Sequence, residues 1–242
     1  MSPAIGTNKI ILILVLSAIV ITGVSIIVVS TTKDNKKRKI RYGHRENNNL
    51  TVIKSNEEIV KPNVKLNAEL ELVKMKNGMR GLLINDFTAS KSLLEIAMNN
   101  GSFIDTDWGI SHFGEHMTLQ GSEKYSPLYP LFNHFFGISN SDINAFTAGN
   151  FQAYYIVLTN GYKYETAIDL LADAFRYPLY LPDIIEKEIE AVNHEFYDNL
   201  HQPGLEYDII RQLASNKTGF HGNTGGNNET LKKMKVKCYL KN

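Results

Sequence analysis

Short apolar stretches bounded by turn residues predict β-strands in the middle of the chain. Two of them, residues 70–75 and 79–86, flank the tripeptide Lys-Asn-Gly at 76–78. Asn-Gly between two such runs is the strongest short-range signal for a β-hairpin. Residues 92–101 and 152–159 predict two more strands, the second rich in aromatic and β-branched side chains. A sheet is therefore expected in this part of the chain.

Apolar positions spaced three and four residues apart predict helices between and after these strands. Residues 163–178 show this spacing, and a second such segment covers residues 182–199. A third helix is expected around Glu115, and the chain from Asn216 onward is expected to form an irregular loop. Strands and helices that do not strictly alternate are typical of an α+β fold. We therefore predict a mixed, mostly antiparallel sheet covered by helices on one side.

An uninterrupted apolar run near the N-terminus adds a further element. Residues 10–30 carry no charge, and a helix of this length spans roughly 30 Å, which matches a bilayer core. We expect a retained transmembrane helix, and the alternatives are a cleaved signal peptide or a buried helix of a folded domain. Seven Lys and Arg residues lie within thirteen positions after the run, whereas only Lys9 precedes it. The positive-inside rule then predicts a single-pass membrane protein with its main domain in the cytosol.

Composition divides the chain further. A net charge of +1 gives no reason to expect a nucleic-acid partner, and the single cysteine, Cys238, excludes an internal disulfide and a Cys-based zinc finger. Residues 31–65 are basic, polar and Asn-rich and are expected to form a flexible tether. The predicted organisation is a flank at residues 1–9, a membrane anchor at 10–30, this tether, and one folded domain at 66–242.

The sequence HFGEH, which begins at His112, carries the candidate chemistry. On a helix, His116 lies about 40° around the axis from His112, so both imidazoles project from one face, as chelation of one ion requires. Ile110, Phe113 and Met117 gather on an adjoining face that is expected to bury against the sheet. The order inverts the His-Glu-x-x-His zinc motif, in which a carboxylate that does not bind the metal takes a proton from water. Alone, the pattern fits two zinc ligands and two surface or core histidines about equally.

A zinc site of this kind requires a third protein ligand. The predicted helix at 182–199 offers four glutamates. Glu188 and Glu195 lie two turns apart beside its apolar stripe, whereas Glu186 and Glu190 face the opposite side. Only the first pair is therefore placed to reach inward from this helix.

Four segments, in this order along the chain, resemble blocks of the insulinase/pitrilysin family of inverzincin metallopeptidases. They read KNGMRGLLINDFTASKS, SHFGEHMTLQGSEKY, NAFTAGNFQAYYIVL and EKEIEAVNHEFYDN. The resemblance covers roughly residues 66–230, and His112 and Glu195 are 83 residues apart, similar to the interval in the family. It implies the family's fold and a zinc-dependent endopeptidase that acts on peptides bound in an extended form.

Residue by residue, the resemblance also implies a set of roles. His112, His116 and Glu195 match the positions of the Zn²⁺ ligands. Glu115 matches the general base that activates water. Glu188 matches a carboxylate that orients a ligand histidine through its second ring nitrogen.

The same resemblance implies a strand that binds substrate. Asn144, Ala145 and Phe146 match positions where family members add the substrate backbone to a sheet edge, although Asn144 taken alone is a turn residue. Family members have two homologous halves, and the second contributes residues near the scissile bond. Because this sequence ends at Asn242, we expect a domain that is incomplete at its C-terminus. It is then a fragment, a chain that needs a complementary C-terminal half or partner chain, or a chain without activity.

The function predicted from the sequence is a membrane-anchored zinc metalloendopeptidase with peptide substrates. One alternative is a non-catalytic subunit of the same fold with a peptide-binding or structural role. The presence of His112, Glu115, His116 and Glu195 together speaks against it. Another alternative is a membrane adaptor whose histidines are structural, which an absence of bound zinc would favour.

Overall fold

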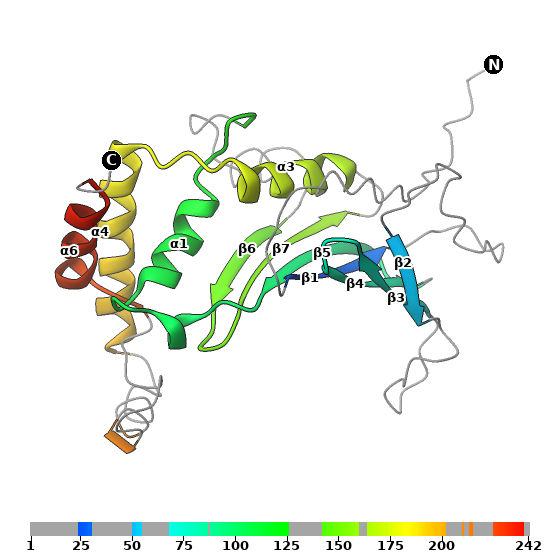
Figure 1. Ribbon diagram of the computed structural model, residues 1–242, viewed down its shortest axis with the longest axis horizontal. Coiled ribbons are helices and arrows are strands. Elements are labelled where there is room, and N and C mark those ends of the chain that lie inside the picture. Colours follow the sequence, from blue (N-terminus) through cyan, green and yellow to red (C-terminus); the bar gives the residue numbers. More distant parts are fainter. Residues whose placement is uncertain are drawn as a thin grey trace. The chain divides into compact units, whose positions relative to one another are not determined.

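The computed structural model combines a mixed sheet with helices (Figure 1). It describes residues 24–30, 50–54, 68–86, 88–125, 142–159, 164–201, 210, 213–214 and 225–239. The strands follow the order β2-β3-β4-β1-β5-β7-β6 in a seven-stranded sheet. They are β1 (Val24–Ser30), β2 (Leu50–Lys54), β3 (Ala68–Met75), β4 (Arg80–Asp86), β5 (Lys91–Met98), β6 (Asp142–Thr147) and β7 (Gln152–Thr159). The helices are η1 (Ser102–Ile104), α1 (Ile110–Thr118), α3 (Tyr164–Arg176), α4 (Pro182–Asn199) and α6 (Asn228–Tyr239). The predicted mixture of a sheet and helices is confirmed.

The chain divides into two compact units. Strands β1 to β4 belong to the first, and helices α1, α4 and α6 belong to the second. The full division assigns Met1–Ile96, Phe135–Ile143 and Tyr155–Ala172 to unit 1, and Ala97–His134, Asn144–Tyr154 and Asp173–Asn242 to unit 2. The predicted domain boundaries at residues 9, 30 and 65 remain predictions.

The hairpin predicted around residues 76–78 is confirmed in unit 1. β3 and β4 pair antiparallel, with Leu72 opposite Leu82. Gly78 has a φ of 88°, and its N–H donates to the carbonyl of Met75 over 2.9 Å. The Asn77 side chain accepts from the N–H of Met79 over 3.1 Å. Glycine supplies the left-handed backbone that the turn requires, and the asparagine side chain pairs a donor that the turn would otherwise leave open.

The apolar run at residues 10–30 differs from its prediction. Its last third, Val24–Ser30, forms strand β1 and pairs in parallel with β4, with Ile27 opposite Leu82. Among the residues that the structure describes, no helix is both long enough and apolar enough to cross a membrane. The predicted single-pass membrane anchor, and the cytosolic placement of the main domain derived from it, are therefore wrong. An apolar run without periodicity fits a buried strand as well as a helix, and the β-branched residues of β1 favour the strand.

Strand β2 lies inside the segment predicted to be a flexible tether, residues 31–65. It pairs antiparallel with β3, with Leu50 opposite Met75 and a register shift between Val52 and Lys54. The rest of that segment lies outside the described residues, as do the predicted flank at residues 1–9 and the run from 10 to 23. Five residues of the segment therefore belong to the sheet.

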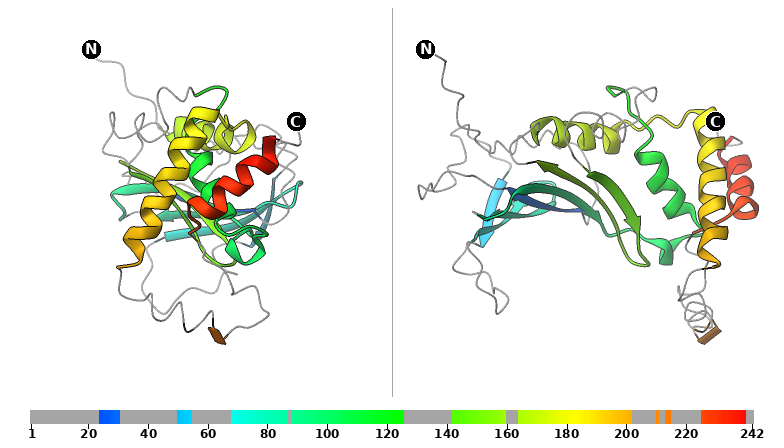
Figure 2. Two further views of the ribbon diagram at one scale, coloured as in Figure 1. Left: turned by 90° about the vertical axis from the view of Figure 1, so that its left-hand side faces the viewer. Right: turned by 180° about the vertical axis from the view of Figure 1, so that it is seen from behind.

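Helix α4 lies between α1 and α6 in unit 2, as the views in Figures 1 and 2 both show. The apolar face of α1 was expected to bury against the sheet, but Phe113 and Met117 instead form a core cluster with side chains from the other two helices. The buried members of that cluster are Phe113, Met117, Ile189, Val192 and Leu231. The apolar stripe of α4 is complementary to that of α1, and packing the two together removes both from water.

The helices of unit 2 begin and end at identifiable signals. α4 starts at Pro182, where the missing N–H of proline costs no hydrogen bond, and Asp183 places a negative charge in its first turn. α6 occupies part of the tail that was expected to be an irregular loop, so that expectation is wrong for Asn228–Tyr239. The side chain of Asn227 accepts from the backbone N–H groups of Glu229 and Thr230, which caps α6.

Candidate metal centre

Helix α1 presents two imidazoles on one face. His112 and His116 lie one turn apart, with ring centroids 4.8 Å from each other and ring planes at 89°. The N-terminus of α1 is held by Asp105, whose carboxylate accepts hydrogen bonds from the backbone N–H and the hydroxyl of Ser111. A carboxylate at this end of a helix also opposes the helix dipole favourably. The two rings are therefore carried by a short helix with an anchored start.

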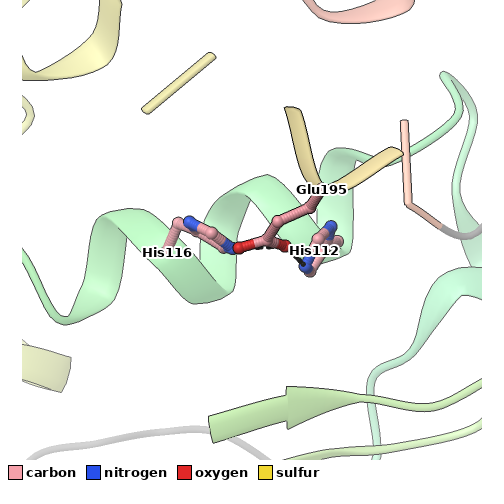
Figure 3. Close-up of side chains that lie close together, drawn as sticks. All are labelled: His112, His116 and Glu195. Carbon is pink, nitrogen blue, oxygen red and sulfur yellow. Dashed lines mark ion pairs between the residues drawn. The ribbon is translucent and has the colours of Figure 1, made fainter. Parts of the chain in front are cut away.

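Helix α4 brings a carboxylate to these two rings (Figure 3). One oxygen of Glu195, Oε2, lies 3.4 Å from Nε2 of His112 and 3.5 Å from Nε2 of His116. One donor atom from each of the three residues falls within 4.8 Å of the others. The Glu195 side chain is 48% exposed, so the group faces solvent on one side. A site open on one side is what a metal-bound water or a substrate would require.

The other ring nitrogens of both histidines already have hydrogen-bond partners. Nδ1 of His112 lies 2.9 Å from the carbonyl oxygen of Gly225, and Nδ1 of His116 lies 3.0 Å from Oε2 of Glu188. A carbonyl and a carboxylate only accept hydrogen bonds, so both Nδ1 atoms carry the proton. When the rings are neutral, as metal binding requires, each Nε2 has a lone pair directed at Glu195. Two neutral imidazoles and one carboxylate are a ligand set that Zn²⁺ takes, and the residues present therefore fit that ion.

Ion pairing governs the charge of this group when no metal is bound. Burial would lower the pKa of His116, but the contacts to Glu188 and Glu195 outweigh it and raise the pKa to about 9. Burial is likewise the largest influence on His112, and the contacts to Glu195 and the Gly225 carbonyl leave its pKa raised. Hydrogen bonds from His112 and His116 lower the pKa of Glu195. In the metal-free protein these contacts thus favour the protonated form of both histidines and the ionised form of Glu195.

Glu115 lies beside the three donors but outside their cluster. Its side chain is buried, and its Oε2 accepts a hydrogen bond of 2.6 Å from the hydroxyl of Thr147 in β6. Burial raises the pKa of Glu115, and the Thr147 hydrogen bond lowers it in part. A carboxylate with a raised pKa is suited to take up a proton and release it again near neutral pH.

A buried glutamine supports this arrangement from β7. The Gln152 side-chain N–H groups donate to the carbonyl of Ser111 over 2.6 Å and to the hydroxyl of Thr147 over 3.0 Å. Asn100 in turn donates to Gln152 over 3.3 Å. Gln152 therefore connects the first turn of α1 with the hydroxyl that holds Glu115. Nothing in the sequence pattern around Thr147 and Gln152 indicated these contacts, because they form only when β6 and β7 lie beside α1.

The three residues predicted to bind substrate lie on β6. Asn144 and Phe146 are exposed, Phe146 by 43%, and Ala145 is half-buried. The Asn144 side chain accepts from the backbone N–H of Ala145 over 2.8 Å. β6 is the last strand of the sheet order, so one of its edges has no neighbouring strand among the described residues. The predicted difference among the glutamates of α4 appears in their contacts, since Glu188 and Glu195 lie beside the imidazoles. Exposure does not separate the two pairs, because Glu195 is exposed like Glu186 and Glu190.

A mixed sheet with helices carries a group of three donors, His112, His116 and Glu195, that could hold a metal ion, and the comparisons with known proteins show the family of this fold. The family model described as Insulinase (Peptidase family M16) matches residues 80–218, and the chain belongs to this family. The chain is 31% identical over 162 residues to the A-factor-processing enzyme of Saccharomyces cerevisiae, which covers 66% of this chain and 16% of the relative. It is 31% identical over 189 residues to insulin-degrading enzyme-like 1, peroxisomal, of Arabidopsis thaliana, covering 77% and 19%.

The fold is likewise similar to a solved structure of the same family. The crystal structure of pitrilysin matches with a TM-score of 0.63 and 29% identity, covering 75% of this chain and 19% of that chain. The chain thus spans less than a fifth of the length of these relatives. Relatives in this family are peptidases, and the resemblance inferred from the four sequence segments is confirmed.

Proposed function

We propose that this chain carries the zinc centre of a metalloendopeptidase, with His112, His116 and Glu195 as the ligands. The observation that supports this most directly is the position of the Glu195 carboxylate, within 3.5 Å of both Nε2 atoms although it comes from another helix. Bound there, Zn²⁺ would polarise a peptide carbonyl and lower the pKa of a coordinated water toward ~7. The second ring nitrogens are held by Gly225 and Glu188, which keeps both rings in the coordinating orientation.

Glu115 is the proposed general base and acid. It adjoins His116 in sequence, lies outside the ligand cluster and is held at one oxygen by Thr147, which leaves its other oxygen to face a water. The carboxylate takes a proton from the attacking water and passes it to the leaving amine as the peptide bond breaks. General acid–base catalysis of this kind contributes about 10²- to 10⁴-fold to the rate.

Extended peptides are the proposed substrates, bound along the edge of β6. An open strand edge offers backbone donors and acceptors that an extended peptide can pair with, independent of its side chains. Asn144, Ala145 and Phe146 line this edge, and Thr147 follows them directly and touches the proposed base. A peptide on β6 would therefore run next to Glu115.

Metal analysis combined with a Glu115→Gln variant tests the proposal. We expect one zinc per chain in both proteins, because Glu115 is not a ligand, and loss of peptide cleavage only in the variant. Cleavage is measured for the chain alone and with a complementary C-terminal half added. Equal cleavage by both proteins would contradict the role of Glu115, and absence of zinc from the wild-type chain would contradict the site.

A second candidate function follows from the same edge strand. The exposed edge of β6 suits peptide binding without cleavage as well as with it. Bound zinc, measurable peptide binding and no cleavage under any of these conditions would favour a peptide-binding subunit over an enzyme.

A further inference from the structure

We infer that the close pairing of Gly109 with Gly226 is a positioning device, which sets the Gly225 carbonyl on His112 and so directs Nε2 of this ring toward the metal. The inference rests on the proposed zinc site. Gly225 and Gly226 lie beyond the residues that match the family model, which end at 218. They belong to the part of the chain from Asn216 onward that was predicted to be an irregular loop.

The two glycines approach each other more closely than any other residue type would allow. A Cβ placed on Gly226 would lie 2.8 Å from the Cα of Gly109, and one placed on Gly109 would lie 2.3 Å from the Cα of Gly226. Non-bonded carbon atoms pack best at roughly 3.5–4.0 Å. Both residues also have positive φ angles, 83° at Gly109 and 75° at Gly226, which side chains disfavour. Two independent constraints therefore require glycine at this contact.

The contact joins the start of α1 to the carbonyl that holds His112. Gly109 is the N-cap of α1, and its carbonyl accepts the N–H of Phe113 over 2.8 Å. The Gly225 carbonyl precedes Gly226 and lies 2.9 Å from Nδ1 of His112. A shift of Gly226 relative to Gly109 would also move the Gly225 carbonyl relative to His112, because Gly225 is bonded directly to Gly226 and His112 lies in the first turn of the helix that Gly109 caps.

The loop is also tied to the helix that supplies the third ligand. The backbone N–H of Asn228 donates to the side chain of Asn193 in α4 over 3.0 Å, two residues before Glu195. The capping contacts of Asn227 fix the loop to α6. The Gly225 carbonyl is thus placed from three helices at once. Nδ1 of His116 is held instead by the Glu188 side chain of α4, a contact that does not involve this loop.

Gly226→Ala tests the inference, with Gly114→Ala as the matched control. Gly114 lies in α1 between the two histidines, and a Cβ there would meet nothing within 4 Å. We expect Gly226→Ala to weaken zinc binding about 10- to 100-fold, the usual effect of losing a partner behind a metal ligand, and Gly114→Ala to leave it within about twofold. Zinc affinity is measured by competition with a chelator in the full chain.

Proton exchange at the imidazoles separates positioning from general destabilisation. In the zinc-loaded wild-type chain, NMR should show slowly exchanging Nδ1–H protons on His112 and His116. Gly226→Ala should speed exchange at His112 alone, because the His116–Glu188 contact is independent of the loop. If Gly226→Ala does not fold, Asn193→Ala, which loosens the same loop from α4, should show the same selective change at His112 with a smaller loss of zinc affinity.

Three results would overturn the inference. The first is a folded Gly226→Ala chain that binds zinc as tightly as Gly114→Ala. The second is an exchange rate of the His112 Nδ1–H proton that is the same in Gly226→Ala or Asn193→Ala as in the wild type. These two outcomes leave the proposed function standing if the wild-type chain binds one zinc. A wild-type chain that binds no zinc would overturn both the proposed function and this inference.

Discussion

The β3–β4 hairpin of unit 1 and the α1–α4 helix pair of unit 2 bury apolar side chains in the same way but treat their charged residues differently. In the hairpin, Leu70 and Leu83 are buried while Lys74 and Arg80 point to solvent. In the helix pair, His116 and Glu188 lie half-buried directly beside the apolar core. Removing ionisable groups from water costs free energy unless they are paired, so a fold that needed only stability would place them outward. The difference supports the proposed position of the metal centre on the helix pair.

The largest loss of zinc affinity is expected when Glu195, the proposed ligand that α4 contributes, is replaced. Glu195→Gln keeps the size of the side chain but removes the charge that faces both Nε2 atoms. Loss of a partner behind a ligand already costs about 10- to 100-fold in affinity, so we expect loss of the ligand itself to exceed ~100-fold. Competition titration with a zinc chelator measures this. The control is Glu186→Gln on the exposed face of α4, which should bind zinc like the wild type.

The affinity for zinc should depend on pH, because the half-buried histidines of the helix pair must lose a proton to bind the ion. His116 must lose its proton to bind metal, and its pKa is raised to about 9 in the metal-free protein, while the lowered pKa of Glu195 keeps that group ionised. Zinc affinity should therefore fall as the pH drops below 9, by about tenfold per unit for each proton displaced. Calorimetry in buffers of different ionisation enthalpy should detect at least one proton released per zinc at pH 7. Affinity that is independent of pH between 6 and 8 would contradict this.

The stability of the metal-free fold should change with pH in the opposite direction and fall as the pH rises from 6.5 to 9. A pKa raised from 6.5 to about 9 stabilises the folded state below pH 6.5, and this contribution is lost as the pH rises through 9. The lowered pKa of Glu195 contributes above 4.5 and is lost as the pH falls further. Thermal unfolding of the metal-free chain should thus show this stabilisation between pH 4.5 and 6.5 and its decline toward pH 9. A His116→Gln variant should lack the part of this pH dependence that comes from His116, the decline in stability between pH 6.5 and 9.

Thr147→Val is expected to slow peptide cleavage about tenfold without changing zinc content. The substitution preserves the shape of the side chain but removes the 2.6 Å hydrogen bond to Glu115, and hydrogen bonds to charged groups contribute about 1.5–3 kcal/mol. Thr147→Ser keeps the hydroxyl and should retain most of the activity. If the valine and serine variants cleave equally well, the hydroxyl does not hold the base.

The smallest change in zinc affinity is expected from substitutions in the apolar cores of the two units. Leu231→Ala removes a buried side chain from the cluster that joins α1, α4 and α6, and Leu94→Ala removes one from β5 in unit 1. Each should lower the free energy of unfolding by about 2–5 kcal/mol. Only Leu231→Ala should also weaken zinc binding, by a few fold, when both are measured well below the unfolding temperature. A matching loss in Leu94→Ala would show that the two cores do not act separately on the site.

Periodic patterns made the helices and the hairpin predictable. The spacing of apolar positions predicted which glutamates of α4 lie on the side of α1, and Glu188 and Glu195 are the two that lie beside the imidazoles. Asn77 and Gly78 identified the β3–β4 turn because their local conformations suit it. In these cases, side-chain period and turn chemistry act over a few residues, so the sequence carries the information locally.

The structure of the apolar run, and the groups that hydrogen-bond to the site residues, could not be predicted from such local patterns. A continuous apolar segment has no period, so hydropathy alone did not distinguish strand β1 from a membrane helix. The Thr147 hydroxyl, the Gln152 amide and the Gly225 carbonyl reach the site only through tertiary packing. The Gly109–Gly226 contact links residues more than a hundred positions apart, and no pattern in a single sequence pairs them.

X-ray absorption at the zinc edge, recorded on the full chain with one equivalent of zinc, tests whether His112, His116 and Glu195 bind the ion. We expect a first shell with two imidazole nitrogens at about 2.0–2.1 Å and oxygen ligands at about 2.0–2.2 Å. His116→Ala should remove one imidazole from that shell or prevent zinc binding. A shell without imidazole, or a spectrum that the substitution leaves unchanged, would show that the ion binds elsewhere and that His112, His116 and Glu195 do not form the metal centre.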